Sequence, residues 1–187
     1  MQTDMTVGKP MKMILDFTIP VFIGNVFQQF YNMADAIIVG KFVGTKGLAA
    51  VGSTGTIMFL IIGFLMGLTA GFTVLTSQKF GAGKMDEMRQ SVGNAALLSI
   101  IISVIMTAVS MVGMHSLLTL MHTPEDIFQD AYTYIMIISA GIIATIFYNL
   151  FSSYLRAVGN SKIPLVFLVF SAALNVILDL VLIINFK

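Results

Sequence analysis

Five long apolar stretches dominate the sequence, and they restrict what the chain can fold into. A helix needs about 20 mostly apolar residues to cross the hydrocarbon core of a bilayer, and each stretch reaches that length. The apolar runs are continuous and do not alternate with a period of two, which argues against a membrane-spanning β-barrel. The sequence therefore predicts an all-α, polytopic transmembrane helical bundle, with helices near 14–38, 47–77, 91–121, 129–155 and 162–185.

The composition agrees with a bilayer environment and excludes several classes of function. Only 10% of the residues are charged and 57% are hydrophobic, whereas a soluble domain is about 25% charged. A net charge of +1 leaves no basic surface for nucleic acid. Without cysteine there is no disulfide, zinc–thiolate site or thiol nucleophile. Because motifs for nucleophilic catalysis, paired-histidine metal sites and phosphate loops are also missing, we expect neither an enzyme nor a cofactor.

The distribution of lysine and arginine predicts the orientation of the helices. Cytoplasmic loops carry the excess of these residues in multi-pass membrane proteins. Seven of them fall on the side of the N-terminus and three on the other side, which predicts a cytoplasmic N-terminus in the cell membrane. The larger group is Lys9, Lys12, Lys79, Lys84, Arg89, Arg156 and Lys162, and the smaller is Lys41, Lys46 and Lys187.

A polar stripe follows the first predicted helix. At 100° per residue, its five members fall within an arc of about 120°. Such a stripe is strongly unfavourable against lipid, so it must face the bundle interior or a water-filled cavity. Hydrogen bonding that only holds the helices together is the alternative reading. The stripe consists of Asn25, Gln28, Tyr31, Asn32 and Asp35.

The fourth predicted helix adds a weaker polar set, of which Asn149 and Ser152 are the candidates for lining a cavity. Serine side chains inside a helix also bond back to their own backbone. Both readings therefore stay open for this set.

Two carboxylates lie well inside the predicted spans, Asp35 in the first and Asp179 in the fifth. An ionisable residue at membrane depth is costly and marks a functional site by default. Asn175 precedes Asp179 by one helical turn, so the two side chains share a face. Carboxylate and amide oxygens suit a small cation, and a carboxylate can instead carry a proton. We expect a transient Na⁺ or H⁺ at Asp35, Asn175 and Asp179, and no other metal.

Three glycines four residues apart share one face of the second predicted helix. They are Gly63, Gly67 and Gly71. Small residues at this spacing let a neighbouring backbone approach closely. We therefore expect this face to be a site of tight helix packing.

Five short motifs resemble the multidrug and toxic compound extrusion (MATE) family. They occur in the family's order, each at the expected helix or loop, and the resemblance runs from about Lys9 to the end of the chain. The motifs are residues 28–35 (QQFYNMAD), 47–52 (GLAAVG), 77–83 (SQKFGAG), 154–160 (YLRAVGN) and 175–179 (NVILD).

The resemblance implies an antiporter that exports cationic, amphiphilic drugs or toxic compounds in exchange for Na⁺ or H⁺. Family members have two six-helix lobes with the drug cavity between them. They couple to the cation through a first-helix aspartate and a fifth-helix asparagine–aspartate pair, which correspond here to Asp35, Asn175 and Asp179. On this basis residues 1–187 are expected to form a partial N-terminal lobe, about five of six helices, which needs the second lobe or another chain for transport.

Two other functions remain open at this point. One is a lipid-linked oligosaccharide flippase of the same larger superfamily. Its pyrophosphate lipid calls for arginine and lysine in the cavity, and the interiors of the predicted helices contain neither. The other is a membrane fragment that does not transport and only packs with partners through its polar residues.

Single cysteines introduced into this cysteine-free chain test the predicted topology. With the N-terminus inside, Lys46→Cys and Thr123→Cys should react with an impermeant thiol reagent added outside intact cells, and Lys84→Cys should be protected. Labelling of Lys84→Cys together with protection of Lys46→Cys would reverse the orientation.

Overall fold

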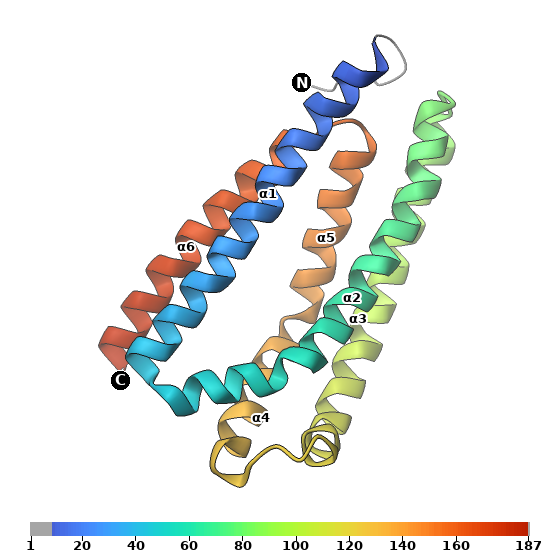
Figure 1. The fold of residues 1–187 in the computed structure, drawn as a ribbon. Helices are drawn as coiled ribbons and strands as arrows, with labels where there is room; N and C mark the ends of the chain where they lie inside the picture. Colours follow the sequence, from blue (N-terminus) through green and yellow to red (C-terminus); the bar gives the residue numbers. More distant parts are fainter. Residues whose placement is uncertain (1–8, 187) are drawn as a thin grey trace. The chain divides into compact units, whose positions relative to one another are not determined.

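The computed structural model describes residues 9–186, and this part of the chain is helical throughout apart from short connections (Figure 1). No strand occurs in these residues, which confirms the all-α fold class. The elements are α1 (Pro10–Ile38), the π-helical segment η1 (Val39–Val43), α2 (Thr45–Gly81), α3 (Met85–Leu120), α4 (Glu125–Ala140), α5 (Ile142–Ala157) and α6 (Lys162–Phe186).

Four helical segments of the described residues are each long and apolar enough to cross a bilayer. They are α1 with η1, α2, α3 and α6. The pair α4 and α5 counts as a fifth span if it is taken as one helix broken by a bend of 50°. The region 129–155, expected as one helix, is therefore two helices that meet at Gly141. The apolar pattern continues across the break, so hydropathy alone does not reveal it.

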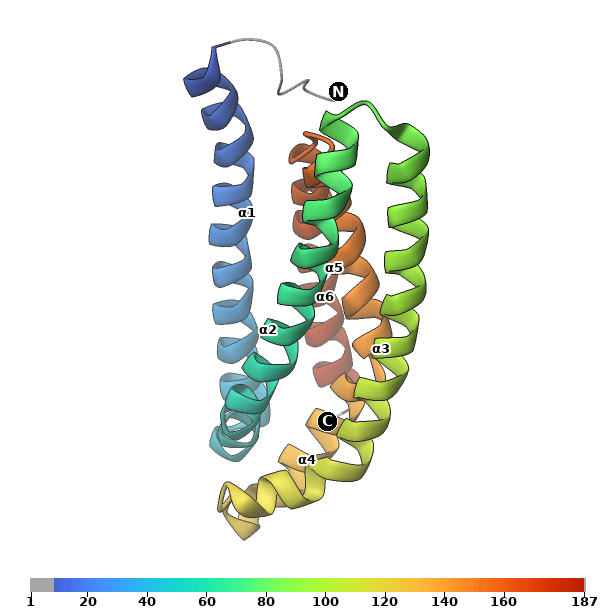
Figure 2. The ribbon, with the colours of Figure 1, turned by 90° about the vertical axis from the view of Figure 1, so that its right-hand side faces the viewer.

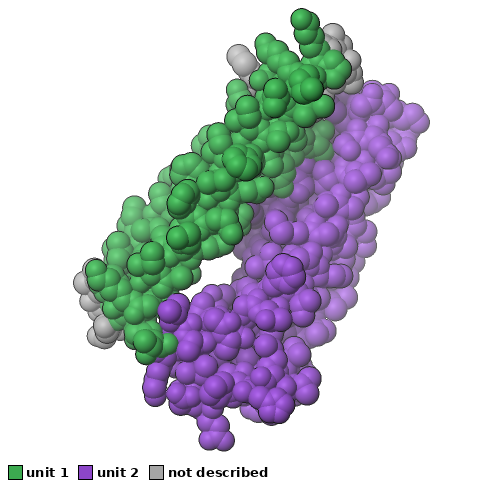
Figure 3. Space-filling view, viewed as in Figure 1, with its two compact units in different colours: residues 1–45, 155–187 green, residues 46–154 purple. Residues whose placement is uncertain are grey.

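The chain divides into two compact units, drawn in different colours in Figure 3. The first combines the two ends of the chain, residues 1–45 and 155–187, and contains α1, η1 and α6. The second is residues 46–154 and contains α2, α3, α4 and nearly all of α5.

In the first unit, α1 and α6 run side by side and in the same direction (Figure 1). The two helices meet at Gly24, where a Cβ would make ordinary van der Waals contacts, 3.5 Å from Leu168 Cδ2 and 3.6 Å from Leu165 Cδ1. Positions on α6 that are partly shielded from solvent recur every three or four residues, as expected for one helical face. They include Leu165, Leu168, Ala172, Asn175 and Asp179.

The start of α6 is fixed by a polar side chain. The amide N–H of Ile163 donates to Asn160 Oδ1 at 3.2 Å, which satisfies one of the amides left without a partner at a helix N-terminus. Gly159, the residue before Asn160, has a φ of 80°, a conformation that glycine adopts at little cost. The motif at 154–160 therefore ends in the turn from which α6 begins.

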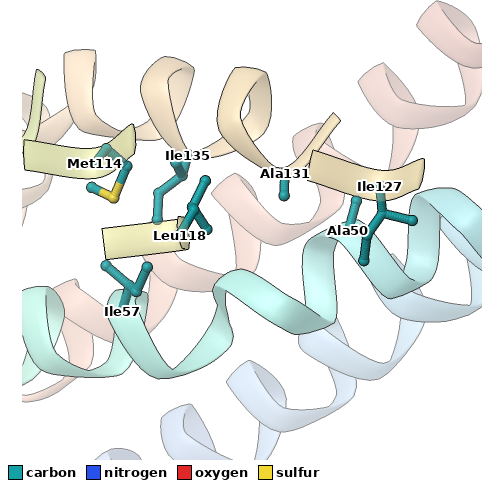
Figure 4. Packing of buried hydrophobic residues seen from close by; sticks show 7 residues of the cluster. All are labelled: Ala50, Ile57, Met114, Leu118, Ile127, Ala131 and Ile135. Atoms are coloured by element: carbon teal, nitrogen blue, oxygen red, sulfur yellow. The ribbon is translucent and has the colours of Figure 1, made fainter. Parts of the chain in front are cut away.

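In the second unit, α2, α3 and α4 share an apolar core (Figure 4). Its buried members are Ala50, Ile57, Met114, Leu118, Ile127, Ala131 and Ile135. A second cluster joins Leu65 of α2 to Ile142 and Ile146 of α5. Figure 2 shows the helices of this unit from the side. Burial of these side chains holds the unit together.

The small-residue face that packs closely is on α3 rather than on α2. Ala95, Ser99 and Ser103 recur every four residues of α3 and are each at most 3% exposed. One turn before Ala95 on α3, Ser91 Oγ lies 3.1 Å from Thr76 Oγ1 of α2. These small side chains let α3 approach its neighbours.

Within the second unit, the expectation of close packing at Gly63, Gly67 and Gly71 is wrong. All three glycines are exposed, and a Cβ at any of them would meet no atom within 4 Å. Spacing identified a face made of small residues, but it could not show which neighbour, if any, that face would meet.

Substitutions at Gly24 test the α1–α6 contact. Gly24→Ala should keep or raise the thermal stability of the chain in detergent, because its Cβ makes ordinary van der Waals contacts and alanine favours a helix by about 1 kcal/mol over glycine. Gly24→Phe should lower the stability, because the ring overlaps the two leucines of α6. Equal melting temperatures for the two variants would contradict this packing.

Candidate functional site

The packing register of α1 and α6 brings the two membrane-depth carboxylates together. Gly24 meets Leu168, and Asp35 and Asp179 each follow these residues by eleven positions. Because both helices rise about 1.5 Å per residue, the two aspartates arrive at the same height. Their carboxyl groups lie within hydrogen-bonding reach of each other. The structure thus joins the two residues that sequence reasoning selected separately.

Two carboxyl groups at this separation cannot both carry a bare charge without strong repulsion. A hydrogen bond between them requires a proton on one of the two groups. Within the described residues, neither aspartate forms an ion pair with a lysine or arginine. A proton or a cation at the pair would remove this repulsion.

Asn175 adds a third oxygen to this part of α6. Its Oδ1 and the Oδ2 of Asp179 are both buried and have no hydrogen-bond partner among the described residues. Buried oxygens without partners are uncommon, and both atoms are acceptors. Two such acceptors one turn apart fit a cation or a proton donor placed between α1 and α6.

Tyr31 belongs to the same cluster. It lies one turn before Asp35 on α1 and interacts electrostatically with both Asp35 and Asp179. A phenol can donate a hydrogen bond to a carboxylate or offer its oxygen to a cation. The sequence predicted Tyr31 only as part of the polar stripe. Its spacing of four residues from Asp35 was the signal that could have assigned it to the carboxylate pair.

The rest of the polar stripe lies at the rim of the α1–α6 contact. Asn25, Gln28 and Asn32 are exposed, whereas Tyr31 and Asp35 are half-buried. The amide of Asn32 donates to Gln29 Oε1 at 3.2 Å on its own helix. The stripe is wider than the strip of α1 that α6 covers, so it divides into a covered half and an open half. That the open half borders water stays a prediction.

The polar residues of α5 lie in the second unit. The side-chain amide of Asn149 donates to the carbonyl oxygen of Thr145 at 2.9 Å, one turn earlier on its own helix. Ser152 is buried, with 6% of its surface exposed. The hydrogen bond of Asn149 agrees with the alternative that these polar side chains bond to their own helix. A cavity-lining role for Asn149 and Ser152 stays a prediction.

All the candidate site residues lie in a region that matches a known protein family. Residues 20–181 match the sequence profile of the family described as MatE. A probable multidrug resistance protein, YpnP of Bacillus subtilis (strain 168), is 31% identical over 175 residues, which are 94% of this chain and 39% of that protein. An FAD transporter of Shewanella oneidensis is 23% identical over 92% of this chain and 38% of its own length. The chain thus spans about two fifths of the relatives it matches.

Solved structures also align with most of this chain. A MOP superfamily transporter from Pyrococcus furiosus aligns with a TM-score of 0.86 and 29% identity, over 92% of this chain and 38% of that one. A crystal structure described as MATE in the bent conformation gives a TM-score of 0.87 at 29% identity, over 96% of this chain and 40% of that one.

Cysteine accessibility along α1 tests the open half of the stripe. Single cysteines at Asn25, Gln28 and Asn32 should react with a small charged thiol reagent at least about tenfold faster than cysteines at Val26 and Ile37, because only an ionised, hydrated thiol reacts readily. A uniform profile around the helix would instead support a stripe that serves only for packing.

Proposed function

The chain belongs to the MatE family of membrane transporters, and from this premise we propose that it forms part of an antiporter that exports organic cations in exchange for Na⁺ or H⁺. The family match confirms the resemblance in the sequence motifs and indicates a transporter rather than an enzyme. The observation that carries the coupling proposal is the pairing of Asp35 with Asp179 between α1 and α6. The drug-resistance names of the relatives support the substrate class.

Ion binding at this pair acts on the contact between two helices. Two unit charges about 4 Å apart repel by roughly 4 kcal/mol at an effective dielectric of about 20. A proton or Na⁺ between Asp35 and Asp179 removes that repulsion, and its release restores it. A ligand shifts a conformational equilibrium only by its differential affinity for the two conformations. The difference in repulsion between the ion-bound and ion-free pair can therefore bias how α1 packs against α6.

The two coupling ions would use the site differently. A proton needs only the two carboxyl groups, one protonated and hydrogen-bonded to the other. Sodium needs several oxygen ligands, for which Asn175 Oδ1 and Asp179 Oδ2 are the buried acceptors without partners and Tyr31 is the neighbouring hydroxyl. The same cluster therefore supports either ion, and we propose one site rather than two.

Transport itself requires more than this chain provides on its own. Alternating access in such carriers moves one structural repeat against another, so we propose a second lobe or another chain as an obligatory partner. We place the chain in the cell membrane with its N-terminus in the cytoplasm, as the lysine and arginine distribution suggests.

Substitution of the carboxylates tests the coupling proposal. Asp35→Asn and Asp179→Asn should each lower ion-driven efflux at least about tenfold, because an amide neither carries a proton nor neutralises a cation. The double variant should be little worse than either single one, since groups that act as a unit are not additive. Asn175→Ala should have a milder effect. Efflux is measured in cells lacking their own pumps, with the chain joined to its second lobe.

Asp16→Asn is the matched control. Asp16 is also a carboxylate of α1, but it is exposed near the start of the helix, so its loss should leave efflux unchanged. Wild-type efflux in either Asp35→Asn or Asp179→Asn under an imposed Na⁺ or H⁺ gradient would remove that residue from the coupling site.

A further inference from the structure

The break between α4 and α5 is an irregularity within the second unit that the coupling site does not use. The helices meet at a bend of 50°, and Gly141 is the single residue between them. No proline occurs from Glu125 to Ala157, so proline does not cause the bend. The remaining causes of sharp kinks are glycine and serine near the bend, or a side chain or water inserted into the helical hydrogen bonds.

The backbone at the break is supported by side-chain hydroxyls. The N–H of Gly141 donates to the Ile138 carbonyl at 2.9 Å, a tight turn in place of a regular helical bond. The Ser139 carbonyl accepts from Thr107 Oγ1 of α3 at 3.3 Å. The Gly141 carbonyl accepts from Thr145 Oγ1 at 3.3 Å. Two of the carbonyls at the bend thus have hydroxyl partners, one of them from another helix.

A cavity of ≈ 80 Å³ lies beside this break. Apolar side chains of α2, among them Met58 and Leu65, form one wall. Ser139, Ile142 and Thr145 contribute the side formed by α4 and α5. By this measure a cavity needs only about 10–15 Å³ to hold one water, so there is room for more than one.

Ser139 supplies a polar group that has no protein partner. Its side chain is buried, with 1% of its surface exposed, and its Oγ has no hydrogen-bond partner among the described residues. Ser103 of α3 is equally buried, but its hydroxyl donates to the Ile100 carbonyl at 2.8 Å. Since buried polar groups nearly always find partners, the hydroxyl of Ser139 calls for a small hydrogen-bonding ligand in the cavity that it lines.

We propose that this cavity is a water-binding site and that the bound water makes the break at Gly141 a hinge. Ser139 Oγ and the oxygen of Thr145 hold the water beside the bend. A water-mediated hydrogen bond is nearly as favourable as a direct one, so peptide groups at the break can exchange partners as α4 swings. Irregular backbone at membrane depth is tolerated where it lines a water-filled cavity. The proposal does not depend on the ion site of α1 and α6.

Amide hydrogen exchange of the intact chain in lipid nanodiscs tests for the water, with D₂O as the probe. Amides of residues 141–145 should exchange at least about tenfold faster than those of residues 103–107 in the uninterrupted middle of α3, because water reaches peptide groups at the break. Equal protection of the two segments would show a dry cavity and overturn the proposal.

Variants of Ser139 identify the anchor of the water. Ser139→Ala removes the hydroxyl, and Ser139→Val also fills part of the cavity, so each should slow exchange of residues 141–145 several-fold. Ser139→Thr keeps the hydroxyl and should retain the native rate. Ser103→Ala is the matched control and should change nothing at 141–145. Native rates in both Ser139→Ala and Ser139→Val would show that this hydroxyl holds no water.

Spin-label distances test the hinge. Labels on cysteines at Ile137 and Phe151, both exposed, report the angle between α4 and α5. The native chain should give a broad distribution of distances, and Ser139→Val should narrow it. If Ser139→Val does not fold, Ser139→Ala provides the same comparison. A single narrow distribution in the native chain, unchanged by the substitution, would show a rigid bend and overturn the hinge.

Discussion

A backbone surrounded by hydrocarbon must satisfy its hydrogen bonds within the protein, and the whole structure follows from this requirement. The apolar stretches become helices because a helix satisfies its peptide groups locally. Where a helix is interrupted, side-chain groups form the hydrogen bonds that the backbone no longer makes with itself. At Gly141, hydroxyls of Thr107 and Thr145 bond the carbonyls beside the bend. The irregular part of the fourth span also carries the buried, unpartnered hydroxyl of Ser139 beside a cavity, which is why water is the ligand we assign to it.

The candidate coupling site depends on one close contact between helices. At Gly24, α1 packs against Leu165 and Leu168 of α6 in a register that places Asp179 level with Asp35. A shift of one residue would turn a carboxylate by 100° away from its partner. Apolar packing and the position of the charges are thus linked, and an ion that changes the repulsion between the carboxylates acts on the same helix contact.

Within the second unit, α2 and α3 use small residues in different ways. On α3, Ala95, Ser99 and Ser103 are covered by neighbouring helices, whereas no other helix of the second unit packs closely on the glycine face of α2. Both patterns have the same spacing in the sequence. Close packing needs a complementary partner as well as a small face, and spacing within one helix carries no information about the partner.

The sequence by itself determined the all-α membrane fold, the family, and the residues Asp35, Asn175 and Asp179 as candidates. These inferences rest on the cost of placing a residue type in lipid, which is a property of the residue and not of its neighbours. Only the tertiary structure decided that Asp35 meets Asp179, that Tyr31 joins them, and that the fourth span breaks at Gly141. Each of these depends on which side chains from distant parts of the chain pack together, and a hydropathy pattern does not encode those contacts.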